Sequence, residues 1–130
     1  DTLSCGAQTE VELIDSAPAV TVFTFNCMQG GTVRVKGQAK GDNSLVDTTW
    51  YVYRVRAGTQ TLIGSQTISA TSYTSFTAVD VSIQYGDLIR VDAYSEDLPG
   101  TGNGDVRNVS IHTDGTQPIW TTSNFGYIYV

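Results

Sequence analysis

One segment of the chain reads Val33-Arg34-Val35-Lys36-Gly37-Gln38-Ala39-Lys40. Small or apolar residues alternate with polar ones along this segment. Successive side chains of a β-strand point to opposite faces of its sheet, so a period of two predicts a strand with one buried and one solvated side. The same alternation recurs in one segment after another, and none of them shows the period of a helix. The sequence therefore predicts an all-β fold.

The composition favours the same fold class. Val, Ile and Thr number 14, 8 and 18, and with the 13 aromatic residues they make up 53 of the 130 residues. Glu, Lys, Leu and Met together number only 12. β-branched and aromatic residues favour strands, whereas the four scarce types favour helices. A chain of this length buries roughly two thirds of its surface around one core, so we expect a single domain, 1–130, in which 1–18 form a partly irregular N-terminal arm.

Gly, Pro, Asn and Asp separate the alternating segments at intervals of about ten residues. The predicted strands span residues 10–14, 19–27, 31–40, 48–57, 60–69, 73–83, 87–95, 106–113 and 117–130. Parallel pairing would need crossover helices, and the sequence contains no helical pattern to supply them. The predicted fold is a single antiparallel β-sandwich or jelly roll of about eight to ten strands.

Charge and hydropathy argue against two classes of partner. The net charge is -6 and the isoelectric point is near 4.4. Binding to nucleic acid needs cations that replace the counterions of the phosphates, so we expect no nucleic-acid partner. No apolar run approaches the roughly 20 residues of a membrane-spanning helix, so we expect no membrane insertion.

Residues that carry nucleophilic catalysis are scarce. The chain has one histidine, His112, and no Gly-x-Ser-x-Gly motif. A Ser-His-Asp or Cys-His site needs a base that a further group orients, so we predict no catalytic residues. A glycosidase needs only two carboxylates at a suitable separation, and the 13 Asp and Glu residues leave that hypothesis open as the third choice.

The longest turn-rich stretch spans residues 96–105 and is expected to protrude as a loop. Calcium takes several oxygen ligands from a flexible loop, and Asp97, Asn103 and Asp105 carry such oxygens. Their spacing differs from that of the twelve-residue calcium loop, and turn-forming residues explain the same sequence without an ion. Calcium is the one cofactor that the sequence leaves open, because one His and two Cys do not complete a four-ligand zinc site.

The two cysteines, Cys5 and Cys27, allow two interpretations. A disulfide between them would tie the N-terminal arm to the strand at 19–27 and would stabilise the fold by about 3 kcal/mol in an oxidising compartment. Alternatively, both are small buried thiols, because cysteine often packs as an apolar residue.

Cations gather in one short part of this acidic chain. If the strands at 31–40 and 48–57 pair through the loop between them, Lys36 faces Arg54 and Arg34 faces Arg56. Trp50 then lies outward and close to Lys40, as a cation–aromatic contact or a stacking platform. The predicted binding face consists of Arg34, Lys36, Lys40, Trp50, Arg54 and Arg56. It suits an acidic surface such as a second copy of this chain, although a solvated face screened by salt explains the same pattern.

Aromatic side chains suggest a sugar site, because their faces stack on the apolar faces of pyranose rings. The candidates are Trp50, Trp120, Tyr73, Tyr85, Tyr94, Tyr127 and Tyr129. Most aromatic residues in strands fill the core or form cross-strand pairs instead.

The segments 51–64, 75–77 and 85–91 resemble a pattern of small sandwich modules on tailed-phage particles. In those modules a strand meets a Gly turn, here Ala57-Gly58-Thr59, another strand ends in a Gly-Asp corner, here Gly86-Asp87, and the chain returns through the core. The resemblance covers residues 30–95 and carries over no catalytic or ligand residue. It implies a decoration, fibre or appendage domain that acts by attachment. Noncatalytic carbohydrate-binding modules share these features, and the cysteine pair with a non-Met start is more typical of an exported chain.

These observations lead to one main hypothesis and one alternative. The main hypothesis is a noncatalytic structural or attachment module at a virion or extracellular surface, which forms a homo-oligomer or a larger protein assembly through its sheet faces and loops. The alternative is the carbohydrate-binding module of an extracellular protein, with a glycan as partner. An assembly protein presents a large self-complementary patch, whereas a sugar binder presents aromatic rings along a groove.

Overall fold

A computed structural model describes residues 2–7, 11–13, 19–28, 30–97 and 102–113. These residues form ten strands: β1 (Thr2–Ala7), β2 (Val11–Leu13), β3 (Val20–Asn26), β4 (Gly31–Gly41), β5 (Val46–Arg56), β6 (Thr59–Ile68), β7 (Thr74–Ser75), β8 (Val79–Ile83), β9 (Leu88–Asp97) and β10 (Gly104–Thr113). The all-β prediction is confirmed. In this described part of the chain, no helix is long and apolar enough to cross a membrane.

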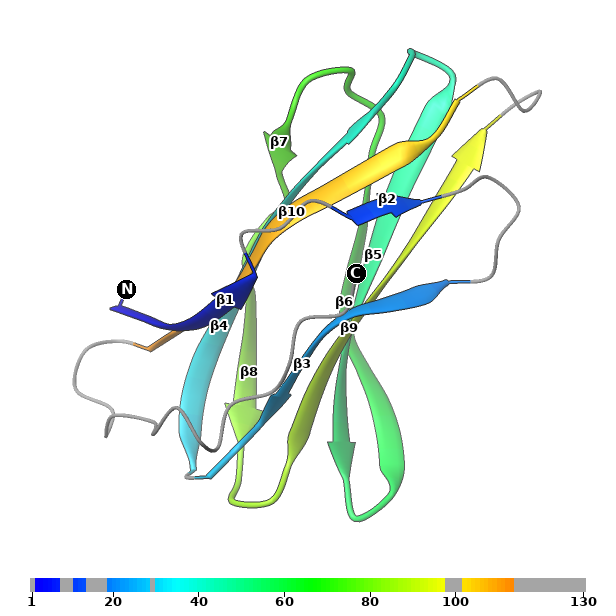
Figure 1. Ribbon diagram of the computed structural model, residues 1–130. Coiled ribbons are helices and arrows are strands. Elements are labelled where there is room, and N and C mark those ends of the chain that lie inside the picture. The colour runs from blue at the N-terminus through cyan, green and yellow to red at the C-terminus, as the bar shows by residue number, and fades with distance from the viewer. Residues whose placement is uncertain (1, 8–10, 14–18, 29, 98–101, 114–130) are drawn as a thin grey trace.

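The strands form two antiparallel sheets. Sheet A has the order β1-β10-β4-β7, with β2 also paired to β10 and β8 also paired to β4, and sheet B has the order β3-β9-β5-β6. Because β1 and β2 share one edge of sheet A and β7 and β8 share the other, the ten strands occupy eight positions. The chain passes from sheet B to sheet A and back again along β3, β4 and β5 (Figure 1). This strand order is that of a jelly roll.

The alternation in β4 is confirmed. Val33, Val35 and Ala39 are buried, and the intervening polar side chains are half-buried on the outer face of sheet A. The inner faces of the two sheets meet in one core, in which Phe23 of β3 and Ile111 of β10 are fully buried. The inward side of β4 therefore belongs to the core, and its outward side carries the polar residues of the strand.

The predicted outward position of Trp50 is wrong. Trp50 is fully buried and its ring stacks on that of Phe76, with ring centroids 4.3 Å apart. Val46, Thr48 and Val52 share its inward side of β5, whereas Tyr51 is half-buried on the outer face of sheet B. Both sides of β5 are rich in apolar or aromatic residues, so alternation alone does not show which side faces the core.

The predicted pairing of β4 with β5 is also wrong, because the two strands lie in different sheets. β4 pairs with β10, β7 and β8, and β5 pairs with β6 and β9. Lys36 therefore faces Ser110 rather than Arg54. Arg34 faces His112 on one side and Asp80 on the other, and not Arg56. The short segment 42–45 crosses between the sheets instead of closing a hairpin.

Two of the predicted boundaries differ from those of the structure. The N-terminal arm contains β1, which pairs with β10 at the edge of sheet A, and β2 lies close to the strand predicted at 10–14. The strand predicted at 73–83 is interrupted, because 76–78 leave the ladder between β7 and β8. The strand predicted at 117–130 lies outside the described residues.

Candidate functional site

The ladder of β4 is interrupted on both sides of Gly37. On the β10 side, Arg107 faces Gln38 and Ser110 faces Lys36, so that two residues of β10 oppose Gly37 alone. On the other side, β7 ends at Ser75 opposite Gln38, and β8 begins at Val79 opposite Val35, so that residues 76–78 lie outside the ladder. Bulges of this kind redirect side chains and are frequent beside binding sites.

Asn108 occupies the β10 bulge in an unusual backbone conformation. Its φ of 55° lies in the left-handed region, which asparagine tolerates better than most residues. Its Nδ2 donates a hydrogen bond to Oε1 of Gln38 at 3.1 Å. The bulge thus places the side chain of Asn108 over β4, where a regular strand would continue the ladder.

On the other side of β4, the segment between β7 and β8 turns inward at Phe76. The amide of Phe76 donates to the carbonyl oxygen of Gly37 at 2.9 Å, and its ring is buried against Trp50. Gly37 is needed beneath this stack, because a Cβ there would lie 3.0 Å from Cζ3 of Trp50. The segment 76–78 therefore stays attached to β4 although it leaves the ladder.

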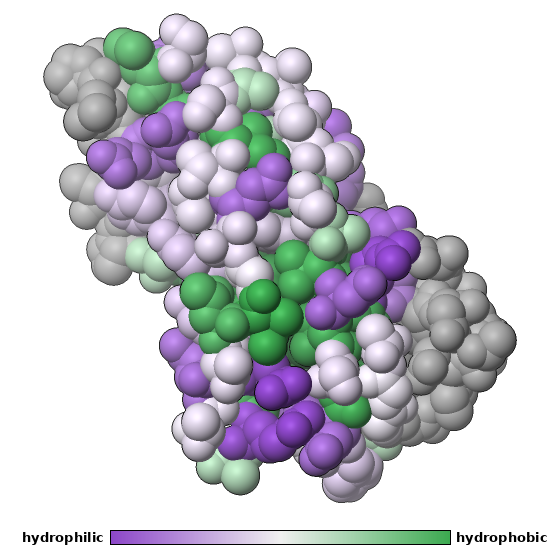
Figure 2. Space-filling view, turned by 180° about the vertical axis from the view of Figure 1, so that it is seen from behind, coloured by the Kyte–Doolittle hydropathy of each residue, from purple (hydrophilic) through white to green (hydrophobic). Residues whose placement is uncertain are grey.

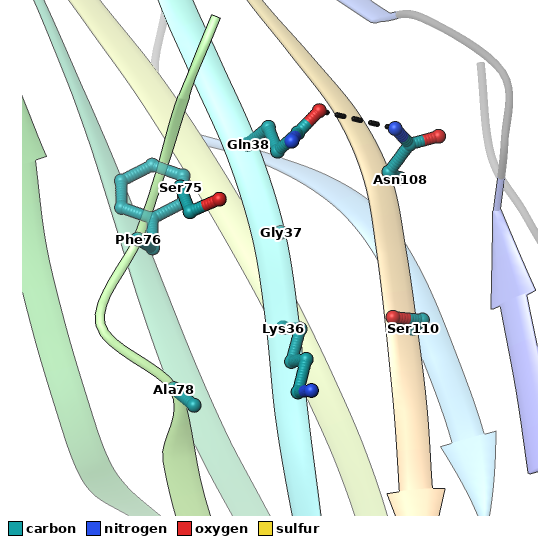
Figure 3. A pocket seen from close by; sticks show the side chains of 8 residues that line it. All are labelled: Lys36, Gly37, Gln38, Ser75, Phe76, Ala78, Asn108 and Ser110. Atoms are coloured by element: carbon teal, nitrogen blue, oxygen red, sulfur yellow. Dashed lines mark hydrogen bonds between the residues drawn. The ribbon is translucent and has the colours of Figure 1, made fainter. Parts of the chain in front are cut away.

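A cavity of about 420 Å³ opens between these two interruptions, on the outer face of sheet A. Its lining residues are Lys36, Gly37, Gln38, Ser75, Phe76, Ala78, Asn108 and Ser110. Figure 3 shows these residues on three neighbouring segments, with β4 in the middle, 75–78 on one side and β10 on the other. We call this cavity the β4 pocket. Its lining combines two amides, two hydroxyls and one ammonium group with the apolar surface of Phe76 and Ala78.

An arginine–tyrosine stack lies next to the β4 pocket. The guanidinium of Arg107 lies 3.6 Å from the ring centroid of Tyr73, and its Nε donates to Oε1 of Gln38 at 3.0 Å. Lys40 Nζ lies 4.9 Å from the same ring, so the predicted cation–aromatic contact of Lys40 is made with Tyr73 instead of Trp50. Gln38 therefore links the lining of the pocket to the guanidinium of Arg107.

Near the C-terminal end of β10, Nε2 of His112 and Oγ of Ser110 form a hydrogen bond of 2.7 Å. Burial lowers the pKa of His112, and the positive charges of Lys36 and Arg34 lower it further. The imidazole is therefore neutral at pH 7. Nδ1 of His112 has no hydrogen-bond partner in the described part of the chain, so the pair lacks the third group that orients the base in a nucleophilic triad.

The predicted binding face is divided between two places. Arg34, Lys36 and Lys40 lie together on the outer side of β4. Arg54 and Arg56 lie on β5 in the other sheet, where Arg54 Nη1 donates to the carbonyl oxygen of Ser82 and Arg56 forms a two-bond ion pair with Asp87. The structure thus keeps half of the predicted set beside the β4 pocket and removes Trp50, Arg54 and Arg56 from it.

The outer face of sheet B carries two tyrosines that were not among the predicted sugar-binding residues. The rings of Tyr51 and Tyr53 have centroids 6.3 Å apart, and Arg90 lies over the ring of Tyr53 at 4.8 Å. Arg90 also pairs with Asp92, which accepts a hydrogen bond from Thr21. These groups bind one another, so this face offers less to a ligand than the β4 pocket does.

The other aromatic candidates have separate positions. Tyr73 is half-buried beside Arg107, Tyr94 is half-buried on β9, and Tyr85 is 72% exposed in the turn before β9. Trp120, Tyr127 and Tyr129 lie outside the described residues. No aromatic groove of the predicted kind is formed by the candidates whose side chains the structure describes.

The predicted calcium loop is described only in part. Asn103 and Asp42 are joined by two hydrogen bonds, from the amide of Asp42 to the carbonyl oxygen of Asn103 and from the amide of Asn103 to Oδ2 of Asp42. Asp105 is 5% exposed and faces Lys40 across the ladder. The side chain of Asp97 lies outside the described residues. Within those residues no three His, Cys, Asp or Glu side chains group as metal ligands, and calcium at 97–105 stays a prediction.

Cys27 is a free thiol, 1% exposed, at the end of β3. Burial raises its pKa to about 12, and the negative charge of Asp87 contributes to that shift. This matches the interpretation of Cys27 as a small apolar core residue. The structure does not join Cys27 to Cys5 in a disulfide, and the side chain of Cys5 lies outside the described residues.

The back of the molecule carries an apolar patch at its centre, bordered by hydrophilic side chains (Figure 2). Leu62 on the edge strand β6 is 50% exposed, and Ile63 and Val79 are partly buried against the core. Patches of this kind occur on most soluble domains. The β4 pocket has more of the polar chemistry that selects a ligand.

The residues that complete the β4 pocket were missed by reasoning from the sequence. Gln38, Ser75, Asn108 and Ser110 have no motif in common and come together only through strand pairing. The one available signal was Gly37, because an isolated glycine inside an alternating strand is typical of a bulge or a close approach of two chain segments.

Comparisons with known proteins bear on the fold. The sequence matches no family model, and no curated protein matches it. Among solved structures, the chain is similar to a carbohydrate binding module (CBM6cm-2) from Cellvibrio mixtus lichenase 5A in complex with cellotriose, with a TM-score of 0.51. The likeness covers 86% of this chain and 98% of that module at 12% sequence identity. At this identity the likeness shows the β-sandwich fold alone. The ligand of this chain has to be inferred from its own residues.

Proposed function

We propose that this chain is a noncatalytic carbohydrate-binding module of an extracellular protein and that a sugar occupies the β4 pocket. The observation that carries the proposal is the lining of the pocket, in which neutral amide and hydroxyl groups surround an apolar wall on a surface held by interrupted strands. The similar solved structure, a module in complex with cellotriose, supports the same class of ligand.

The lining matches the chemistry of a sugar. Each sugar hydroxyl both donates and accepts hydrogen bonds, and so do the side chains of Gln38, Asn108, Ser75 and Ser110. The exposed Ala78 and the small accessible part of Phe76, which is 4% exposed, supply apolar surface for the carbon-bound hydrogens of the ring. The volume of about 420 Å³ lies within the range of roughly 300–1,000 Å³ that small-molecule sites span.

The hypothesis of a virion appendage has less support. It relied on the resemblance of residues 30–95 to phage modules, and the basic face that was predicted to bind a second copy is divided between sheets A and B. The resemblance to phage modules, the homo-oligomer and the virion location stay predictions. Native mass spectrometry tests the homo-oligomer, because an assembly protein is expected to give a multimeric mass and a sugar binder a monomeric one.

Calorimetric titration with a panel of oligosaccharides that includes cellotriose tests the proposal. Gln38→Ala removes an amide from the pocket and should weaken binding by roughly tenfold, since a lost hydrogen-bonding group at a filled site costs about 1–3 kcal/mol. Gln60→Ala is the matched control. Gln60 lies on β6 and contacts Arg90 of β9, and both strands belong to sheet B, so this variant should bind the glycan as the wild type does. Absence of binding across the panel, or equal affinity of the two variants, would contradict the proposal.

A further inference from the structure

We infer that the glycan of the β4 pocket is acidic and that Arg107, with Lys36, binds the carboxylate of a uronic acid. This inference rests on the proposed function and names the class of sugar that the pocket takes. It starts from an imbalance of charge, since the chain as a whole carries -6. Despite that charge, four of its seven cations lie on the outer side of β4 and β10, namely Arg34, Lys36, Lys40 and Arg107.

The carboxylates that the structure describes on this face, those of Asp80 and Asp105, do not line the pocket. Asp80 is held by Arg34 through two hydrogen bonds of 2.8 and 3.2 Å. Asp105 is buried and faces Lys40 across the ladder. Lys36 and Arg107 stand between these two groups along the strands. His112 contributes no charge at neutral pH, and among the described residues Lys36 lines the pocket while Arg107 lies beside it.

Arg107 is held in place by neutral partners. Its guanidinium stacks on Tyr73, and its Nε donates to Gln38, whose amide also accepts from Asn108. No carboxylate of the described residues forms an ion pair with Arg107. Three of the other four arginines differ, since Arg34, Arg56 and Arg90 each bind an aspartate. The fourth, Arg54, donates to the carbonyl oxygen of Ser82. Arg107 is therefore a fixed cation with donors left over at the rim of the pocket.

The geometry of arginine selects among anions. A guanidinium presents its donors in a planar fork that matches the two oxygens of a carboxylate. Stacking on Tyr73 and the bond to Gln38 fix the plane of that fork before a ligand arrives, which lowers the entropic cost of binding. Lys36, which lines the pocket itself, adds a second positive charge without directional demands. A uronate ring satisfies both the neutral lining and this pair of cations.

The test compares each uronate with its own methyl ester. Calorimetric titrations use trimers of galacturonate, glucuronate and mannuronate, the same trimers after esterification, cellotriose and a sulfated heparin trisaccharide, at low and at physiological ionic strength. We expect at least one uronate trimer to bind roughly tenfold or more tightly than its ester, because a charge-assisted bidentate contact is lost on esterification. Added salt should reduce that difference.

Two arginine variants assign the effect. Arg107→Gln should bring the affinity for the uronate down to that for the ester, and Arg107→Lys, which keeps the charge but loses the fork, should fall between. Arg90→Gln is the matched control, since Arg90 also stacks on a tyrosine and its replacement changes the net charge equally, but it lies on the opposite sheet. Thermal melts of all variants separate loss of binding from loss of fold.

Each contrary outcome points to a different failure. Equal or tighter binding of esters or cellotriose would overturn the acidic-glycan inference and leave the proposed function standing. Tighter binding of the sulfated trisaccharide than of any uronate would overturn the assignment to a carboxylate, and so would equal losses in Arg107→Gln and Arg90→Gln. Binding of no glycan at all would remove the proposed function itself.

Discussion

The indole of Trp50 stacks on the ring of Phe76, with planes inclined by only 5°. Trp50 comes from β5 in sheet B, and Phe76 comes from the segment between β7 and β8 in sheet A. The stack therefore connects the core of the sandwich to one wall of the β4 pocket. Stability and ligand binding are expected to be linked at this contact.

Replacing Phe76 with alanine should lower the free energy of unfolding by about 3–5 kcal/mol, because it removes a buried ring and leaves a cavity beside Trp50. The same change should weaken glycan binding, since the wall of the pocket loses its anchor. Tyr85→Ala is the control, because Tyr85 is 72% exposed and its loss should cost no more than about 0.5 kcal/mol. Urea unfolding followed by tryptophan fluorescence measures the free energy of unfolding of the two variants. Similar losses of stability in Phe76→Ala and Tyr85→Ala would contradict the role given to the stack.

The two-residue turn between β5 and β6 has positive φ at both positions, 50° at Ala57 and 80° at Gly58. Turns with this backbone favour Asn-Gly, and alanine is strained in the left-handed region. Ala57→Asn should therefore raise the free energy of unfolding by roughly 0.5–1 kcal/mol. Gly58→Ala should lower it although a Cβ there meets no other atom, so the two changes should have opposite signs in thermal melts. A loss of stability in Ala57→Asn would show that the turn adopts another conformation.

Asp87 should make the stability depend on pH at the acid side. Its carboxylate accepts hydrogen bonds from Arg56 at 2.9 and 2.8 Å and from the amide of Gln84, and the bond with Arg56 is the main reason why its pKa is lowered. The folded state thus prefers the charged form. The resulting stability is present above about pH 4, the ordinary range of an unfolded aspartate, and is lost as the pH falls through the lowered value.

The variant Asp87→Asn isolates this contribution. At neutral pH it should be less stable than the wild type by about 1–3 kcal/mol, because buried donors lose their acceptor. The difference should shrink as the pH falls below about 4. Urea unfolding across a pH series measures the two curves, and a difference that stays constant down to the acid limit would rule out the role of the carboxylate charge.

Cys27 should be unreactive in the folded protein. Its pKa is raised to about 12, so the folded state keeps the neutral thiol, whereas the unfolded thiol ionises near pH 8.5. Stability from this group is complete below about pH 8.5 and declines as the pH rises toward the folded value. Under non-reducing conditions, iodoacetamide should label Cys27 only after denaturation. Rapid labelling of the native protein would contradict the buried thiol, and a lack of labelling after denaturation would indicate a disulfide with Cys5.

The part of the fold that depends on local pattern could be predicted from the sequence. The alternation in β4 correctly placed Val33 and Val35 inside and Lys36 outside, because only one of the two sides is apolar. In β5 both sides carry large apolar or aromatic groups, and Trp50 was assigned to the wrong side. Which strands pair depends on the whole topology, and the four residues 42–45 between β4 and β5 are as short as a hairpin loop although they connect two sheets.

Only single residues of the candidate site could be predicted, because the site also depends on which strands pair. Lys36 was expected on a binding face, but its predicted neighbours Arg54 and Arg56 belong to the other sheet. Its observed neighbours Ser110 and Ser75 are distant in sequence, and Asn108 enters the pocket through a bulge in β10 for which Gly37 on the partner strand was the one signal. The carboxyl-terminal candidates, including Trp120, lie outside the described residues and stay predictions.

A chemical-shift titration of isotope-labelled protein with the tightest-binding glycan of the panel tests the central claim most directly. The backbone amides of Gly37, Ser75 and Asn108 should show the largest saturable shifts, because the proposed sugar lies over the two interruptions of β4. Amides around Tyr51 and Arg90 on the other sheet should stay in place. Saturable shifts confined to the Tyr51 face, with none around Gly37, would contradict a glycan site in the β4 pocket.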